Sequence, residues 1–298
     1  MKFRKGPDGL HLFERASGFN CLIDEVAIPK HKWAKAPRFV SFALTNICDL
    51  SCRFCYAPKS NDYLPLTSVL AWSRELDSNG CLSIGFGGGE PTLHKDLSTI
   101  CREINKQTAL GITFTTHSHH LDEALCDELV SSVNFVRVSM DGVGETYESI
   151  RGRSFSSLLE RLKIVSSRFN FGINYVVNDQ TLPDLDRALE LIVKHGAQTL
   201  LLLPEHLDGH VDPLIRKELA SWIKKSPKPI NISISENGVD DTLPIANPFD
   251  AETGVDAYAH VTAKGEVSKN SFDLRNSVRI VPQEGIISAI ELLREDNQ

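Results

Sequence analysis

Between residues 38 and 225, short apolar runs alternate with longer segments of helical period, and no other feature restricts the fold of this chain as much. Such alternation is typical of successive β/α units around a parallel sheet. The runs are nearly continuous in apolar or β-branched residues, as strands buried on both faces are. They span residues 39–44, 82–86, 112–116, 135–139, 172–177 and 199–203. Six units, rather than eight, predict an α/β fold with a partial, three-quarter β/α barrel.

Two extensions flank this alternating region. Residues 1–37 are predicted to form a short hairpin-like arm, because they are too few for an independent domain. The last part is predicted to contain a strand at 230–234, a hairpin at 258–267 and a helix from about residue 284. The predicted organisation is an N-terminal arm (1–37), a barrel domain (38–225) and a C-terminal α/β extension (226–298).

Three cysteines lie within eight residues, directly after the first predicted strand, in the pattern Cys48-x3-Cys52-x2-Cys55. Three thiolates on one loop can each hold one iron of a [4Fe–4S] cluster and leave the fourth iron open to a small molecule. A zinc knuckle is a poorer match, because it needs a fourth Cys or His at ligand spacing and none follows nearby. Ordinary buried thiols are the other alternative.

The sequence from Leu44 to Tyr56 resembles the radical S-adenosylmethionine superfamily, and within it the group that contains PqqE-like and sulfatase-maturing enzymes. The resemblance implies a partial barrel with one oxygen-sensitive [4Fe–4S] cluster, held by the three cysteines, and S-adenosylmethionine bound at its open iron. It also implies reductive cleavage of S-adenosylmethionine to a 5′-deoxyadenosyl radical that abstracts a substrate hydrogen. An external one-electron reductant, such as flavodoxin or ferredoxin, is then required.

A second motif, Gly88-Gly89-Glu90-Pro91, closes the second predicted strand. It matches the GGEP motif of the superfamily, and the resemblance implies that Gly88, Gly89 and Glu90 contact the amino group of S-adenosylmethionine. Glycine allows the backbone to approach a ligand closely. Taken alone, the glycine run would indicate only a turn.

Three further residues match cofactor positions of the superfamily. Ser139 ends the fourth predicted strand and Arg151 follows twelve residues later, and sulfatase-maturing relatives use residues at this spacing for the ribose and the carboxylate of the cofactor. A guanidinium suits a carboxylate because the two can form parallel hydrogen bonds. Tyr56 matches an aromatic residue that lies beside the adenine. A solvated arginine and a tyrosine packed in the core are the simpler alternatives.

Polar residues on the remaining loops are candidates for substrate binding. Catalytic groups of a parallel barrel gather at the carboxyl ends of its strands, and the cofactors occupy the first, second and fourth loops. The substrate should therefore meet the other loops, which carry His117, His119, Asn178 and Glu205. We expect His117 or Glu205 to move a proton during catalysis. Solvated histidines without a catalytic role are the alternative.

Composition limits the partners and the location. The formal charge of −7 and the pI near 5.8 give no basic footprint for nucleic acid. No apolar stretch is long enough for a signal peptide or a membrane span, and an iron–sulfur cluster of this kind needs reduced thiols. We therefore expect a cytoplasmic protein without a membrane partner. No cysteine follows Cys126, so the C-terminal extension lacks ligands for auxiliary clusters.

The resemblance leaves the reaction after hydrogen abstraction open. We expect a peptide or amino-acid-like substrate, as in the PqqE-like group. A small-molecule enzyme, such as a sugar or nucleoside oxidoreductase or epimerase, is the alternative with the same radical chemistry. A non-enzymatic iron–sulfur or zinc-binding protein is the alternative from another class. The intact Glu90, Ser139 and Arg151 argue against it.

Overall fold

The fold is built on a sheet of ten strands, in the order β12-β9-β8-β7-β6-β5-β4-β13-β14-β15, within the described residues 1–207, 210–235, 251–272 and 274–295 of a computed structural model. Strands β4 to β9 are parallel, and each pairs with the next along the chain. Their bounds are β4 Phe39–Thr45, β5 Ser83–Gly88, β6 Gly111–Thr116, β7 Phe135–Ser139, β8 Phe171–Val177 and β9 Thr199–Pro204. The six predicted strands are confirmed to within two residues at each end.

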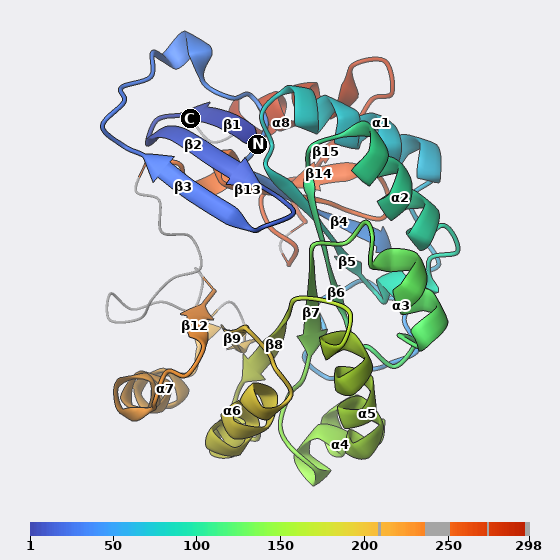
Figure 1. The fold of residues 1–298 in the computed structure, drawn as a ribbon, viewed down its shortest axis with the longest axis vertical. Coiled ribbons are helices and arrows are strands. Elements are labelled where there is room, and N and C mark those ends of the chain that lie inside the picture. The colour runs from blue at the N-terminus through green and yellow to red at the C-terminus, as the bar shows by residue number, and fades with distance from the viewer. Residues whose placement is uncertain (208–209, 236–250, 273, 296–298) are drawn as a thin grey trace.

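Helices cover the convex side of this sheet, which curves without closing into a full barrel (Figure 1). They are α1 Leu66–Ser78, α2 Leu97–Gln107, α3 Glu123–Leu129, α4 Glu145–Arg151, α5 Phe155–Ser166, α6 Leu185–Lys194 and α7 Pro213–Lys225. Helix α2 shows why they pack there, since its buried residues recur at intervals of three and four: Leu97, Ile100, Cys101 and Ile104. The predicted partial β/α barrel is confirmed. No helix of the described ranges is long and apolar enough to cross a membrane.

Alternation along each strand separates an outer face, packed under the helices, from an inner face. In β7, Val136 and Val138 are fully buried in the hydrophobic core, whereas Phe135, Arg137 and Ser139 on the opposite face are partly exposed. Successive side chains of a strand point to opposite faces of the sheet. A ligand at the carboxyl ends of the strands can therefore reach polar side chains on the inner face.

The N-terminal arm is a three-stranded antiparallel sheet rather than a hairpin, with β1 Lys2–Gly6, β2 Gly9–Glu14 and β3 Phe19–Ile23. Arg4 is buried and donates to the Glu252 carboxylate and to the carbonyl oxygen of Gly80 (2.8 Å). Arg15 donates to the carbonyl oxygen of Thr108 (2.8 Å). Because Gly80 and Thr108 precede β5 and β6, the arm lies at the amino ends of the barrel strands, opposite the loops that carry the motifs.

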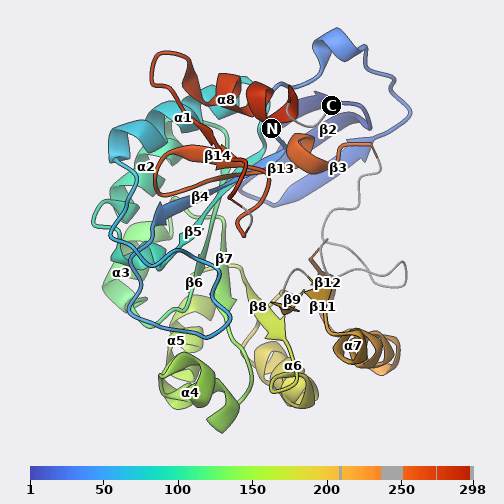
Figure 2. The same cartoon turned by 180° about the vertical axis from the view of Figure 1, so that it is seen from behind.

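The C-terminal extension lengthens the sheet at both edges. Strand β12 (Asn231–Ile234) pairs in parallel with β9, and β13 (Tyr258–Val261) pairs in parallel with β4 and continues into β14 (Glu266–Ser268) and β15 (Val278–Arg279). Helix α8 (Gly285–Glu295) lies beside α1 (Figures 1 and 2), where the Glu75 carboxylate accepts the backbone N–H groups of Ile286 and Ile287. The domain boundaries at residues 37 and 225 remain predictions.

Candidate functional site

The three cysteines of the pattern lie on the loop between β4 and α1, which Figure 2 shows in blue, extending toward α4. A backbone hydrogen bond from Leu64 to Leu44 (2.8 Å) closes the base of this loop. Cys48 and Cys52 are half-buried, Cys55 is exposed, and all seven cysteines of the chain are free thiols. The thiols are therefore available as ligands on one short segment.

Each of the three sulfurs has an N–H donor beside it. The contacts are Leu50 N to Cys48 Sγ (3.4 Å), Arg151 Nη1 to Cys52 Sγ (3.5 Å) and Lys59 Nζ to Cys55 Sγ (4.0 Å). Such donors, two of them cations, suit thiolates that hold an anionic iron–sulfur cluster. Burial raises the pKa of Cys48 and Cys52, so the free thiols keep their protons and metal ions would replace them. The residues present fit a [4Fe–4S] cluster.

Gly88 and Gly89 let the end of β5 lie against the cysteine loop. Gly88 has a φ of +105°, which favours glycine, and a side chain at Gly89 would collide with the backbone of Ile47. The backbone N–H of Gly89 donates to Thr45 (2.7 Å), and that of Glu90 donates to Ile47 (2.8 Å). The two glycines thus join the second loop to the first, and their contact with the cofactor stays a prediction.

The Glu90 carboxylate is 1% exposed, and its orientation is fixed by hydrogen bonds. One oxygen accepts from Thr92 N (3.1 Å), Thr92 Oγ1 (2.6 Å) and Thr116 Oγ1 (2.7 Å), and the other accepts from His117 N (2.9 Å). A carboxylate has about four lone-pair sites, so these donors use most of its capacity. One side chain thereby ties the loop after β5 to the loop after β6.

Asp49, directly after the first cysteine, is the hub of a second polar cluster. Its oxygens lie 2.9 Å from His117 Nε2, 3.2 Å from His120 Nε2 and 2.6 Å from Arg153 Nη2. Partial burial pushes the pKa of Asp49 upward, but the charge and hydrogen bond of His117 outweigh it and hold the pKa at about 2. His117 is 4% exposed and also lies 3.3 Å from Glu90 Oε2. It therefore lies between two loops instead of at an open surface.

The fold brings a histidine, His117, close to Cys48, although no histidine follows the cysteines at ligand spacing in the sequence. The alternative of a zinc site therefore has to be considered again. The Cys48 sulfur, an Asp49 oxygen and a His117 ring nitrogen all lie within 4.8 Å of one another. Three such ligands could hold a divalent ion. However, His117 Nε2 is already within hydrogen-bond distance of Asp49 and Glu90, and a zinc ion there would leave the other two cysteines without a role.

Arg151, the last residue of α4, reaches the cysteine loop. Its guanidinium lies 3.5 Å from Cys52 Sγ and 5.7 Å from the ring centre of Phe54, and it is ion-paired with Asp141. Asp141 is fully buried and also accepts the backbone N–H of Val176 (2.6 Å). Burial alone would lower the pKa of Arg151, but Asp141 and Cys52 outweigh it and raise the pKa. The buried Nε of Arg151 has no hydrogen-bond partner among the described residues.

Comparison with known proteins decides the family. The sequence profile described as "Radical SAM superfamily" matches residues 42–192, just over half of the chain. The chain belongs to the radical SAM superfamily. Enzymes of this superfamily use a [4Fe–4S] cluster and S-adenosylmethionine (SAM), so the chain is an enzyme of that class. The matched span includes every residue that we predicted for the cluster and for SAM.

Curated relatives share the same part of the chain. A probable GTP 3′,8-cyclase of Saccharolobus islandicus is 26% identical over 176 residues, which cover 56% of each protein. A PqqA peptide cyclase of Granulibacter bethesdensis is 28% identical over 164 residues, which cover 52% of this chain and 43% of the relative. The chain therefore spans about half the length of the curated relatives it matches.

Solved structures with the same fold cover most of this radical SAM chain. SuiB of Streptococcus suis superposes with a TM-score of 0.74 at 13% identity, over 98% of this chain and 86% of SuiB. The structure of anSMEcpe with bound AdoMet has a TM-score of 0.66 at 17% identity, over 85% of this chain and 80% of that one. At such low identity the similarity shows the fold alone.

The predicted substrate residues of this radical SAM enzyme fall into two groups. Like His117, His119 belongs to the β6 side: its Nε2 lies 2.9 Å from the hydroxyl of Tyr147, and burial, followed by the charge of His117, lowers its pKa to about 4. On the other side, Asn178 donates to the Glu205 carboxylate (2.7 Å). No described contact joins the two groups.

Three aromatic side chains connect the two ends of the curved barrel sheet. Tyr56, next to the cysteines, is 61% exposed and meets the edge of Phe272, which is 51% exposed, at 6.5 Å between ring centres. Phe272 also stacks on His206 at 6.3 Å. His206 lies in β10 (His206–Leu207), directly after the barrel strand β9. The C-terminal extension thus places an aromatic side chain between the first and sixth loops.

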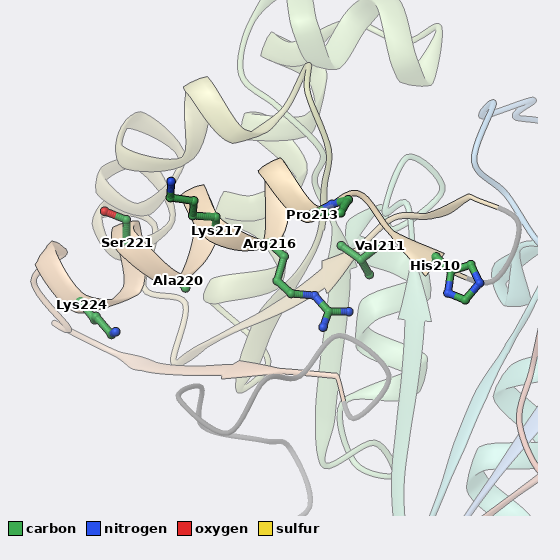
Figure 3. Close-up of a pocket in the computed structure, with 8 residues that line it drawn as sticks. All are labelled: His210, Val211, Pro213, Arg216, Lys217, Ala220, Ser221 and Lys224. Atoms are coloured by element: carbon green, nitrogen blue, oxygen red, sulfur yellow. The ribbon is translucent and has the colours of Figure 1, made fainter.

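A cavity of about 730 Å³ lies along α7 and β11 (His210–Val211) (Figure 3). It is lined by His210, Val211, Pro213, Arg216, Lys217, Ala220, Ser221 and Lys224. None of the residues predicted for the cluster, SAM or substrate lines it. This cavity is therefore separate from the predicted radical SAM site.

Three residues of this region were missed in the sequence, and each had a visible signal. Asp49 is an acidic residue between two cysteines of the pattern, and Asp141 lies two residues after the predicted ribose contact Ser139. Arg137 is a charge inside an otherwise apolar strand, Phe-Val-Arg-Val-Ser. A charge at such a position indicates either an unseen partner or an inner face that is open to a ligand.

Proposed function

We propose that Cys48, Cys52 and Cys55 hold one [4Fe–4S] cluster and that the chain cleaves SAM reductively. When bound, the cluster and SAM supply a 5′-deoxyadenosyl radical that abstracts a hydrogen atom from the substrate. The observation that carries this proposal is the set of N–H donors at the three sulfurs, one of them from Arg151 on a distant helix. The electron would come from an external donor such as flavodoxin or ferredoxin.

In this proposal the chain's own residues bind and orient SAM. Arg151 is held by Asp141 and keeps the N–H of its Nε for the cofactor's carboxylate. Ser139 offers a hydroxyl to the ribose at the end of β7, and Glu90 fixes the turn that faces the amino group. Tyr56 is exposed enough to cover the adenine ring.

We propose a peptide or amino-acid-like substrate. The PqqA peptide cyclase relative supports it, as does the fold shared with SuiB, which was also solved with its precursor peptide SuiA. Glu205, held by Asn178 at the carboxyl ends of β8 and β9, is the candidate for proton transfer after hydrogen abstraction. His117 and His119 are the candidates on the β6 side.

A small-molecule substrate is the second candidate, and a specific observation favours it. The probable GTP 3′,8-cyclase of Saccharolobus islandicus matches slightly more of this chain than the peptide cyclase does. A nucleotide would bring phosphate groups, whereas a peptide would bring carboxylates. The two candidates therefore differ in the anion that the inner face of the sheet would have to accept.

Reductive cleavage of SAM can be tested directly. Anaerobically reconstituted protein, reduced with flavodoxin and supplied with SAM and cell extract, should produce 5′-deoxyadenosine. Cys52→Ala should abolish the product, whereas Cys21→Ser, a change on β3 outside the loop, should not. Wild-type protein that carries a full cluster and yet forms no 5′-deoxyadenosine would refute the proposal.

A further inference from the structure

Arg137 lies in the middle of β7 and on its inner face. Its neighbours Val136 and Val138 are fully buried under the helices, whereas Arg137 shares the opposite, partly exposed face with Ser139. Two residues of a strand span roughly 6.6 Å. Arg137 is thus one layer deeper in the barrel than the proposed ribose contact, toward the amino end of the strand.

The sheet leaves space for this side chain. Arg137 is opposite Gly172 in the register of β7 and β8, and a side chain at Gly172 would collide with Thr199 of β9. Across that gap, Arg137 Nη1 lies 3.4 Å from Thr199 Oγ1 and 3.5 Å from Asn174 Oδ1. These are long hydrogen bonds to neutral oxygens, at the limit of the usual range.

What Arg137 lacks is an anion. The buried guanidinium of Arg4 is paired with Glu252 and that of Arg151 with Asp141. In the part of the chain that the structure describes, no carboxylate lies within ion-pair distance of Arg137, and its guanidinium lies 5.4 Å from the ring centre of Phe135 instead. Burial lowers its pKa to about 10. A largely buried cation without a counter-ion is unfavourable in the folded state.

We propose that Arg137 binds an anionic group of the substrate, a carboxylate or a phosphate, on the inner face of the sheet beneath SAM. A guanidinium can hold either group through two parallel hydrogen bonds. The substrate would then be anchored one layer below Ser139, with the bond to be attacked close to its anionic end. This inference rests on the proposed function, because it assumes that the inner face receives the substrate.

The melting temperature of an Arg137 variant distinguishes a role of Arg137 in ligand binding from a role in supporting the fold. If Arg137 is kept for a ligand, Arg137→Gln should raise the melting temperature of the ligand-free protein, because it removes a partly buried charge that has only long hydrogen bonds to neutral oxygens and no carboxylate partner. Arg74→Gln, a surface change on α1, is the matched control and should leave it unchanged. A clear fall in the melting temperature of Arg137→Gln would show that the cation supports the fold, and would overturn the proposal.

Anion binding identifies the ligand class. Reconstituted wild-type protein is titrated at constant ionic strength with inorganic pyrophosphate, GTP and the tripeptide Ala-Glu-Ala, and the thermal shift is recorded. One class should bind at least tenfold more tightly to wild type and to the surface control Arg74→Gln than to Arg137→Gln. A preference for pyrophosphate and GTP would identify a phosphate, and a preference for the tripeptide a carboxylate. Equal shifts in wild type and Arg137→Gln, or no shift with any probe, would overturn the inference.

The proposed function can fail separately from this inference. Iron content and SAM cleavage without substrate should be the same in Arg137→Gln as in wild type, because Arg137 touches neither the cysteine loop nor Arg151 in the described contacts. If wild-type protein fails to cleave SAM, the proposed chemistry is refuted. Anion binding at Arg137 can still be measured in that case, because the titration does not depend on SAM cleavage.

Discussion

The loops after β4, β5 and β6 and the end of α4 are tied to one another by buried or charge-assisted hydrogen bonds, whereas the loops after β8 and β9 reach them through an exposed ion pair of Arg53 with Asp179 (3.4 Å) and through the ring of Phe272. On the first side, Asp49 and Glu90 each connect two or more loops, and Arg151 joins α4 to Cys52. On the second side, Asn178 donates to the Glu205 carboxylate, and the backbone N–H of Glu205 donates to Val177 (2.9 Å).

This difference indicates where the molecule is preorganised. Groups held by charge-assisted hydrogen bonds keep their geometry before a ligand arrives, so the first side suits ligands that are the same in every turnover. The second side, with the inner face at Arg137, keeps polar groups whose contacts are long or few. Polar groups with few contacts remain available to a ligand, so those groups suit the binding of the substrate.

The largest effect should follow from changes to the cysteine loop. Replacing Cys48, Cys52 and Cys55 together by Ala should reduce the iron content from about four per chain to none, because these residues supply the protein ligands of the cluster. His117→Ala is the control that tests the zinc alternative, and it should leave the iron in place. Metal analysis that finds zinc in wild type, and its loss in His117→Ala, would favour the site at Cys48, Asp49 and His117.

Removing one partner of the Arg151–Asp141 ion pair should cause the largest loss of stability. Arg151→Ala leaves the fully buried Asp141 without its cation, and removal of one partner of a buried pair costs about 3–5 kcal/mol of unfolding free energy. The double variant Arg151→Gln, Asp141→Asn removes both charges and should recover much of that loss. Urea denaturation measures both. If the single and double variants are equally destabilised, the ion pair does not hold α4 against the cysteine loop.

The two sides also differ in what the sequence could predict. The barrel strands, the cysteines and the glycine turn follow from local patterns of periodicity and spacing, and the structure confirms the six predicted barrel strands. The polar cluster at Asp49 could not be predicted, because His117 and Arg153 are 68 and 104 residues away along the chain. Likewise, the family resemblance predicts Arg151 as a SAM contact, but its ion pair with Asp141 becomes visible only when α4 folds back on β7.

The C-terminal extension shows the same limit. Its strand, hairpin and last helix have local signals, and all are present. Their attachment to opposite edges of one sheet depends on which strand edges stay unpaired after β4 to β9 have assembled. Sequence patterns specify elements more strongly than they specify pairing partners.

Substitutions on the loops after β8 and β9 should lower substrate turnover and leave SAM cleavage intact. Glu205→Gln keeps the size of the side chain and its contact with Asn178 but removes the proton-accepting group, so substrate turnover should fall roughly a hundredfold. Asn178→Ala should have a smaller effect, because it only frees the Glu205 carboxylate. Both are measured as modified substrate per 5′-deoxyadenosine formed. A parallel loss of 5′-deoxyadenosine would mean that the two sides are not separate.

The smallest expected effect is on the pH dependence of stability, and it distinguishes the half-buried His119 from the buried His260. The pKa of His119 and that of His260 are both lowered to about 4 from an ordinary value of 6.5. Between pH 6.5 and 4 the unfolded chain binds protons that the folded chain does not, so both histidines make stability fall as the pH falls through this window.

The causes differ between these two residues. Burial alone lowers the pKa of His260, which contacts Ser41 (2.7 Å), whereas for His119 the charges of His117 and Arg153 add to burial. Each of the changes His119→Asn and His260→Asn should therefore flatten the pH slope of the urea midpoint. Added salt screens charges but not burial, so salt should weaken only the contribution of His119. Equal salt dependence in the two variants would show that the charge network around Asp49 does not reach His119.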